Sequence, residues 1–237
     1  MVPRIALLLS ALLLCGCNPP DGDSGLGHAP GTGAQPGLPS GPRSDQPSRQ
    51  PSGGSSGFAV SRGWTVTVYY TAVAALHAGR TVRVTGCRVI DCSDGHDDLG
   101  TYPASFVSAV EDEGTGRIAE GRYLNWSYDT GYWLDTAPRD TAGRALRPWE
   151  SAAADSHVLP AGARFSVVQC GHDEDGDAID AGVCARLREA QWTITDEFTP
   201  GLGGAKHVDL YIGEETGPDF TSSPLYTTLK DATLALG

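Results

Sequence analysis

Short runs in which apolar and polar residues alternate dominate the 237-residue chain beyond residue 58, and Gly and Pro separate them. Alternation with a period of two places successive side chains on opposite faces, which is typical of β-strands. Residues 102–110 and 181–188 are instead candidates for short helices. Because many short strands between Gly and Pro turns build small barrels or sandwiches, the pattern predicts a mainly β fold. The expected strands cover residues 64–73, 81–85, 165–170, 191–196, 207–212 and 226–236.

Two of these strands carry acids at positions that a β-strand disfavours. One strand ends at Asp196, and the next carries Asp209 between Val208 and Leu210, so alternation turns Asp209 away from the apolar face. A carboxylate inside a strand is disfavoured unless the fold uses it. The glycine-rich loop at residues 200–204 joins the two strands and lets the backbone come close. Two acids connected in this way suggest a sugar-cleaving cleft.

The chain begins with an apolar run that is too short to span a bilayer. Arg4 precedes the apolar residues 5–14, whereas a membrane helix requires roughly 20 residues. This pattern indicates a signal peptide, and its end, Leu-Cys-Gly-Cys, resembles a bacterial lipobox. Residues 1–17 are therefore expected to be a lipoprotein signal peptide with Cys17 lipidated; an ordinary signal peptide cut nearby is the alternative. We expect the exported protein to be lipid-anchored to the outer face of the membrane, in the bacterial cell envelope.

Residues 18–57 have the composition of a linker. Of these 40 residues, 25 are Pro, Gly or Ser, so the segment cannot bury enough apolar surface to offset its ordering entropy. We expect a disordered linker followed by one domain at residues 58–237, which is long enough for a sizeable core. The formal net charge of −12 argues against a nucleic-acid partner, because nucleic-acid binding needs a basic face.

Four cysteines, Cys87, Cys92, Cys170 and Cys184, lie in the expected domain. In an exported protein they should be oxidised, and four cysteines permit three pairings. We favour the pairs Cys87–Cys92 and Cys170–Cys184, because both are local and would close loops. Their spacing does not match a zinc site, and the acidic run at residues 173–177 lacks the glycine position and distal Glu of a calcium loop. No metal and no cofactor are therefore expected.

Three motifs in the second half of the chain resemble those of the three-aspartate (3D) domain. Asp155 opens the run Asp-Ser-His-Val-Leu-Pro-Ala-Gly, similar to the family's acid followed by Ile-Pro-x-Gly-Thr. Asp196 is followed by the pair Gly203 and Gly204, and the run Val-Asp-Leu-Tyr around Asp209 is similar to the family's Ile-Asp-Ile-Tyr strand. The family includes membrane-bound lytic transglycosylase A and stationary-phase cell-wall proteins. The resemblance implies a double-psi β-barrel.

The resemblance also implies an enzyme that acts on peptidoglycan or another cell-wall polysaccharide as a lytic transglycosylase with a single acid/base Asp. Asp209 would protonate the glycosidic oxygen and then accept the proton of the C6 hydroxyl that attacks C1. Asp196 and Asp155 would position substrate or stabilise positive charge. Aromatic faces suit the apolar faces of sugars. The candidate substrate-binding residues are Tyr70, Trp126, Trp133, Tyr211, Gly203 and Gly204.

Two other functions stay open on the sequence alone. The run His-Val-Asp-Leu that begins at His207 also resembles a run of the expansins, which share the barrel and loosen walls without cutting glycan. A non-catalytic glycan-binding or wall-loosening module is therefore one alternative. A glycoside hydrolase with two carboxylates on the same barrel is the other.

The expected anchor can be tested by mutation. Cys17→Ser is expected to move the exported protein from the membrane fraction to the soluble fraction, because the lipid on this cysteine supplies the anchor. Cys15→Ala is the matched control and should remain in the membrane fraction. Fractionation with mass spectrometry of the mature N-terminus checks both. An unmodified mature N-terminus elsewhere in the chain would contradict the lipid anchor.

Overall fold

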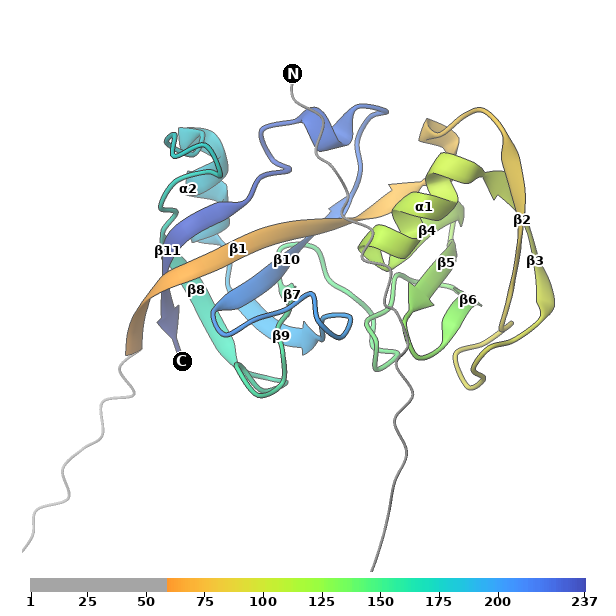
Figure 1. The fold of residues 1–237 in the computed structure, drawn as a ribbon, viewed down its shortest axis with the longest axis horizontal. Coiled ribbons are helices and arrows are strands. Elements are labelled where there is room, and N and C mark those ends of the chain that lie inside the picture. The colour runs from red at the N-terminus through yellow and green to blue at the C-terminus, as the bar shows by residue number, and fades with distance from the viewer. Residues whose placement is uncertain (1–58) are drawn as a thin grey trace, which may run out of the picture. The chain divides into compact units, whose positions relative to one another are not determined.

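A computed structural model describes residues 59–237, and six of its strands close into a β-barrel (Figure 1). The expected signal peptide, the lipidated Cys17 and the linker at residues 18–57 lie outside the described residues. No helix within the described part is long and apolar enough to cross a membrane. The barrel strands are β1 (Ala59–Val73), β7 (Ser151–Ala153), β8 (Arg164–Gln169), β9 (Trp192–Asp196), β10 (His207–Glu214) and β11 (Leu229–Leu236).

The order of strands around the barrel is β1-β10-β7-β9-β8-β11, and β11 pairs with β1 to complete the ring. β1 runs parallel to β10 and β7 runs parallel to β9, whereas the other four neighbouring pairs are antiparallel. The expectation of a mainly β fold built on a double-psi barrel is therefore confirmed.

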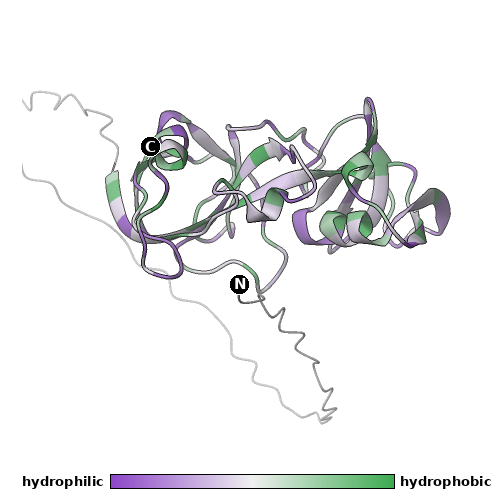
Figure 2. Cartoon of the chain, turned by 90° about the horizontal axis from the view of Figure 1, so that it is seen from above, coloured by the Kyte–Doolittle hydropathy of each residue, from purple (hydrophilic) through white to green (hydrophobic). Residues whose placement is uncertain are grey.

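Alternation along β1 and β10 decides which side chains enter the core. Figure 2 colours the chain by the hydropathy of each residue. Val66 pairs with Val208, and both are fully buried in the main apolar cluster. The next pair in register, Thr67 and Asp209, faces the opposite way. This confirms that the strand turns Asp209 away from the apolar face, as its two apolar neighbours predicted.

β1 is long enough to leave the barrel and continue into a second sheet (Figure 1). Its last residues pair in parallel with β4 (Thr115–Ala119), which pairs with β5 (Arg122–Ser127) and then β6 (Gly131–Asp135). Helix α1 (Ala104–Glu113) packs so closely on β4 that a Cβ on Gly116 would collide with Phe106 and Val110. We call residues 74–135 the side module.

Several elements, most of them in the side module, were located only in part by the sequence. The expected strand at residues 81–85 forms β2 (Thr81–Gly86), but β2 pairs with β3 (Asp97–Pro103) in a separate hairpin. β3, β4, β5, β6 and β7 were not predicted, because they are short or lack clear alternation. Short 3₁₀ turns, η1 (Ala74–Leu76) and η2 (Phe220–Ser222), follow β1 and β10 respectively.

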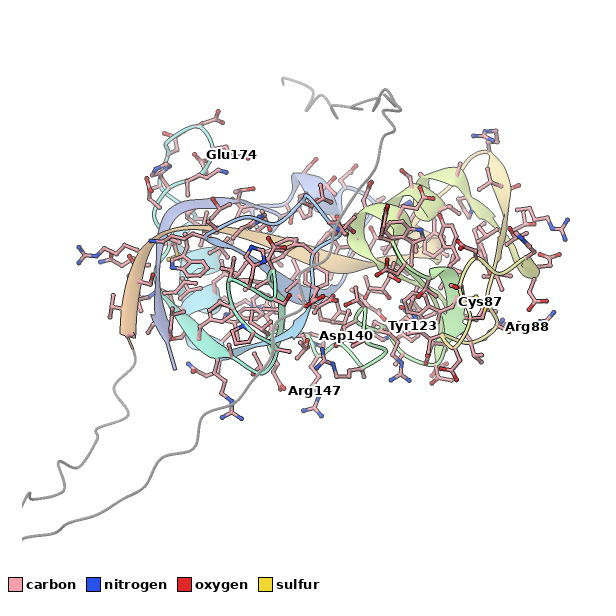
Figure 3. All side chains as sticks on the ribbon, turned by 60° about the horizontal axis from the view of Figure 1, so that its bottom comes forward. Cys87, Arg88, Tyr123, Asp140, Arg147 and Glu174 are labelled. Carbon is pink, nitrogen blue, oxygen red and sulfur yellow. A yellow bond between two sulfur atoms is a disulfide. The ribbon has the colours of Figure 1, made fainter. Side chains whose placement is uncertain are left out.

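Two disulfides join the favoured partners, Cys87 with Cys92 and Cys170 with Cys184. The first closes the loop after β2 in the side module, where Figure 3 labels Cys87. The second ties the end of β8 to helix α2 (Ala181–Glu189). α2 begins at Asp180, whose carboxylate accepts two backbone amides of the first turn, and this cap explains why the helix starts there.

Candidate functional site

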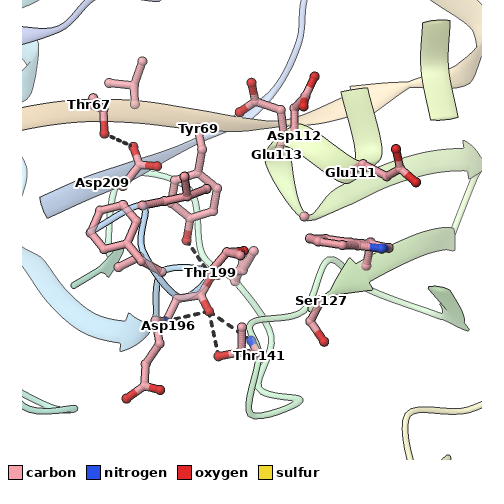
Figure 4. A pocket seen from close by; sticks show the side chains of 18 of the residues that line it. Thr67, Tyr69, Glu111, Asp112, Glu113, Ser127, Thr141, Asp196, Thr199 and Asp209 are labelled. Atoms are coloured by element: carbon pink, nitrogen blue, oxygen red, sulfur yellow. Dashed lines mark hydrogen bonds between the residues drawn. The ribbon is translucent and has the colours of Figure 1, made fainter. Parts of the chain in front are cut away.

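A cleft of about 290 Å³ lies between the side module and the face of β1 and β10 that is turned away from the core (Figure 4). The barrel supplies Thr67, Tyr69, Asp196 and Asp209 to its lining. The end of α1 and strand β5 supply Glu113 and Trp126 from the opposite side. The side module thus forms one wall of the cleft.

Asp209 is half-buried at the barrel wall of the cleft, where the strand register places it opposite Thr67. The Thr67 hydroxyl donates a hydrogen bond of 2.8 Å to Asp209 Oδ1. Burial raises the pKa of Asp209 from 3.8 to about 7, and the charge of Asp196 adds to the rise, whereas the Thr67 bond opposes it. A carboxyl group with this pKa can both give and take a proton near neutral pH.

His207 orients the hydroxyl that holds Asp209. Its Nε2 lies 3.0 Å from Thr67 Oγ1. Because the hydroxyl has one proton and donates it to Asp209, His207 must donate from Nε2 in this arrangement. Burial lowers the pKa of His207, which favours the neutral ring. The chain of three side chains therefore fixes the orientation of Asp209 without placing a full positive charge beside it.

Asp196, at the end of β9, is held by four hydrogen bonds (Figure 4). Its Oδ1 accepts the amide and hydroxyl of Thr141, each at 3.0 Å, and the amide of Glu197 at 2.9 Å. Its Oδ2 accepts the Tyr69 hydroxyl at 3.3 Å. Burial raises the pKa of Asp196, although the bonds from Thr141 and Glu197 oppose the rise. The carboxylate is thus fixed in place by the protein itself.

Glu113 is the principal carboxyl group on the opposite wall. Its Oε2 accepts the amide of Tyr70 at 3.1 Å, and its Oε1 accepts the Tyr226 hydroxyl at 3.0 Å. Burial raises the pKa of Glu113 to about 8, with a further rise from the charge of Asp209. Glu113 is therefore mostly protonated at neutral pH.

Trp126 reaches the cleft beside Glu113 because of the way α1 ends. The helix ends at Gly114, which has a φ of 82°, a left-handed conformation that favours glycine. The Gly114 carbonyl then accepts the Trp126 amide at 2.8 Å, which joins the helix end to β5. Trp126 is half-buried and thus offers an aromatic surface to the cleft next to the acids.

The cleft is strongly acidic. Arg139 lines it too, but its guanidinium is bound to Asp135 at 2.8 Å, so its positive charge is already partly balanced. Such a surface stabilises positive charge that develops in a bound molecule. No group of three or more metal-ligating side chains occurs among residues 59–237. The carboxyl groups in the lining belong to Glu111, Asp112, Glu113, Asp196, Glu197 and Asp209.

Asp155, Gly203 and Gly204 are brought together by the fold, but outside the lining of the cleft. Asp155 Oδ2 accepts the amide of Gly204 at 2.9 Å. A Cβ on Gly203 would collide with the Asp155 carboxylate, so only glycine permits this approach. In the structure these residues hold the loop between β9 and β10, in place of the expected contacts with substrate.

Three of the expected aromatic binding residues are enclosed by protein. Trp133 and Tyr211 are 0% and 1% exposed, and the Tyr211 hydroxyl bonds to Thr71 at 2.6 Å. Tyr70 is 4% exposed and packs against the ring of Phe220. The rings of these three residues are thus buried outside the cleft lining, and their role in substrate binding stays a prediction. Trp126 is the one member of the aromatic set that lines the cleft.

Thr67, Glu113 and Thr141 also line the cleft but were not among the residues predicted from the sequence. The alternation of β1 contained a usable signal for Thr67, since it lies on the polar face of that strand. Glu113 lies just beyond the expected helix at residues 102–110, and Thr141 lies in a segment without periodicity. No local pattern identifies either of these two residues.

Comparisons with known proteins find likeness in structure only. No family model and no curated protein matches the chain. Escherichia coli MltA with bound chitohexaose is 12% identical, with a TM-score of 0.47, over 74% of this chain and 71% of that chain. A membrane-bound lytic murein transglycosylase from Agrobacterium tumefaciens is 11% identical, with a TM-score of 0.46, over 76% of each chain. The lytic transglycosylase LtgG of Burkholderia pseudomallei is 12% identical, with a TM-score of 0.36, over 73% and 70%.

The raised pKa of Asp209 predicts a pH-dependent effect on stability. A raised pKa means that the folded protein holds this proton more tightly than the unfolded chain does. The resulting stabilisation is complete below about pH 4 and is lost as the pH rises through about 7. In Asp209→Asn, the melting temperature relative to the wild type should therefore increase from pH 4 to pH 8.

Glu113→Gln is the matched comparison, and its relative melting temperature should keep rising to a slightly higher pH, because the pKa of Glu113 is raised to about 8. Thermal unfolding of the wild type and both variants across this pH range checks the prediction. A difference between variant and wild type that does not change with pH would contradict it.

Proposed function

We propose that this protein cleaves the glycan strand of peptidoglycan as a lytic transglycosylase in which Asp209 is the single general acid and base. One observation carries the proposal: Asp209 lies half-buried in the acidic cleft, is oriented by Thr67, and has a pKa raised to about 7. The barrel type and the Asp196 and Asp209 motifs support the same class of reaction.

In the proposed reaction, protonated Asp209 donates to the glycosidic oxygen as the bond to C1 breaks. The surrounding carboxylates stabilise the positive charge that develops at C1. Asp209, now ionised, takes the proton of the C6 hydroxyl, whose oxygen bonds to C1. The product is a 1,6-anhydro sugar, and the proton returns Asp209 to its starting state. Trp126 provides a face on which a sugar ring can stack.

Of the other carboxyl groups in the cleft, Asp196 and Glu113 are in states that favour this route over hydrolysis. A two-carboxylate hydrolase needs a second carboxylate that activates water or attacks the sugar. Both oxygens of Asp196 already accept hydrogen bonds from the protein. Glu113 is a poor base at neutral pH because it is largely protonated. Asp209 is therefore the carboxyl group best suited to transfer protons in both steps.

A purely binding or wall-loosening role finds less support in the surface. Such a role requires a flat strip of exposed aromatic side chains. Among residues 59–237, the exposed large apolar residues include a single aromatic residue, Tyr128, and they do not form such a strip. Trp126 faces a recessed cleft instead.

Asp209→Asn is expected to reduce cleavage of purified peptidoglycan by roughly 10²–10⁴-fold, the usual contribution of a general acid, because asparagine keeps the shape and cannot transfer the proton. Chromatography with mass spectrometry measures the rate of anhydro-muropeptide release. Thermal unfolding and glycan pull-down should show that the variant still folds and binds.

Asp175→Asn is the control, since it neutralises an exposed acid that does not line the cleft. This variant should cleave at the wild-type rate. Full cleavage by a well-folded Asp209→Asn protein would end the assignment of Asp209. Wall binding by the wild type with no glycan product would favour the expansin-like alternative.

A further inference from the structure

A second set of reactive side chains lies at the edge of the barrel where β1 and β10 end. Neighbouring parallel strands end at the same edge of a sheet, so the residues that follow them lie close together. His77 follows β1 after η1, and Glu215 directly follows β10. The amide of Glu215 donates to the Thr71 carbonyl at 3.0 Å, which fixes the strand end. Ser105, at the start of α1, completes the set from the side module.

The three side chains are joined in series by hydrogen bonds. His77 Nε2 lies 2.8 Å from Glu215 Oε1, and His77 Nδ1 lies 3.2 Å from Ser105 Oγ. Because an ionised carboxylate only accepts hydrogen bonds, Glu215 holds the proton of His77 on Nε2. Nδ1 is then the acceptor for the hydroxyl proton of Ser105. A nucleophile, a base and a carboxylate that orients the base are the parts of a hydroxyl-activating site.

The three side chains differ in exposure to solvent in the way that such a site requires. The side chain of Glu215 is 4% exposed and that of His77 is 15% exposed, whereas Ser105 is exposed. The amide of Val73 also donates to Glu215 Oε1, and the ring of Phe106 packs edge-on against His77. The carboxylate and the ring are thus held by the fold, while the hydroxyl faces solvent.

The start of α1 provides donors for a developing negative charge. Pro103 occupies the position before the helix, and it makes no side-chain cap. The first amides of a helix point toward its N-terminus and lack partners within the helix. The Ala104 amide donates to the Arg80 carbonyl at 2.8 Å, so Ser105 lies where the other amides of the first turn can stabilise an oxyanion next to its own Oγ.

A cavity of about 550 Å³ opens at this site. Ser105, His77 and Glu215 all line it, and Leu76 and Phe220 give it an apolar side. Two independent features, the hydrogen-bonded series and the cavity, thus coincide. The wall that separates this cavity from the acidic cleft is shared, because Asp112, Glu113 and Tyr226 line both.

We propose that Ser105, His77 and Glu215 form a second active site that hydrolyses carboxylic esters with a small acyl group. The volume of the cavity and its apolar side suit a short acyl chain on a sugar-sized alcohol. That the alcohol is a sugar of the glycan strand rests on the proposed function and on the shared wall. The ester chemistry itself does not depend on it.

In the first half of the reaction, Ser105 Oγ attacks the ester carbonyl carbon and His77 Nδ1 takes the hydroxyl proton. The tetrahedral intermediate collapses, the ester C–O bond breaks, and His77 returns the proton to the departing alcohol. Water then attacks the acyl-serine with His77 as the base, which releases the carboxylic acid and restores Ser105. Ester and water are consumed, and alcohol and acid are formed.

The test uses a fluorophosphonate probe and p-nitrophenyl acetate on the purified protein. Neither compound contains a glycosidic bond, so the result is independent of glycan cleavage. We expect one covalent adduct on Ser105, located by peptide mass spectrometry. In Ser105→Ala the adduct should be absent, and hydrolysis of p-nitrophenyl acetate should fall by at least about 10²-fold.

Ser156→Ala is the control, because Ser156 is an exposed serine that lines neither this cavity nor the acidic cleft. This variant should keep both the adduct and the rate. Ser105 is itself exposed, so its variant should keep the wild-type melting temperature, which checks that the loss is not due to unfolding. The proposal is overturned if Ser105 of the folded wild type takes no label, or if Ser105→Ala hydrolyses the ester as fast as the wild type.

Discussion

The parallel pairing of β1 with β10 is the constraint on which both candidate sites depend. Its register places Thr67 beside Asp209 on the face turned away from the core. A slip of one residue would turn the Asp209 carboxyl into the apolar interior and remove its partner. The same pairing brings the two strand ends to one edge, where His77 and Glu215 meet. A single backbone register therefore positions two separate groups of polar side chains.

Burial and hydrogen bonding act in opposite directions on the carboxyl groups of the cleft, and the balance differs for each. The four donors to Asp196 are supplied by the protein, so its carboxylate is held in place. For Asp209, burial outweighs the single side-chain bond from Thr67, and the pKa is raised to about 7. Asp209 is thus held less firmly than Asp196, which suits the exchange of its proton with a substrate that we propose.

Much of the barrel was readable from the sequence, because a period-two pattern over several residues identifies a strand and its buried face. The positions of Asp196 and Asp209 in the cleft follow from that pattern and the motifs around them. The opposite wall was not readable. Glu113 and Trp126 reach the cleft through the end of α1 and its bond to β5, contacts between segments that no local pattern encodes. Aromatic residues were the weakest basis for prediction, because Trp133 and Tyr211 are buried in the interior.

In the proposed reaction one carboxyl group transfers both protons, and water takes no part in breaking the glycan strand. Digestion of purified peptidoglycan by the wild-type protein in water labelled with oxygen-18, followed by mass spectrometry of the products, tests this most directly. If Asp209 transfers both protons, the products are 1,6-anhydro muropeptides that carry no label. Products with a free reducing end that carry one labelled oxygen would contradict it, because they require water activated by a second base.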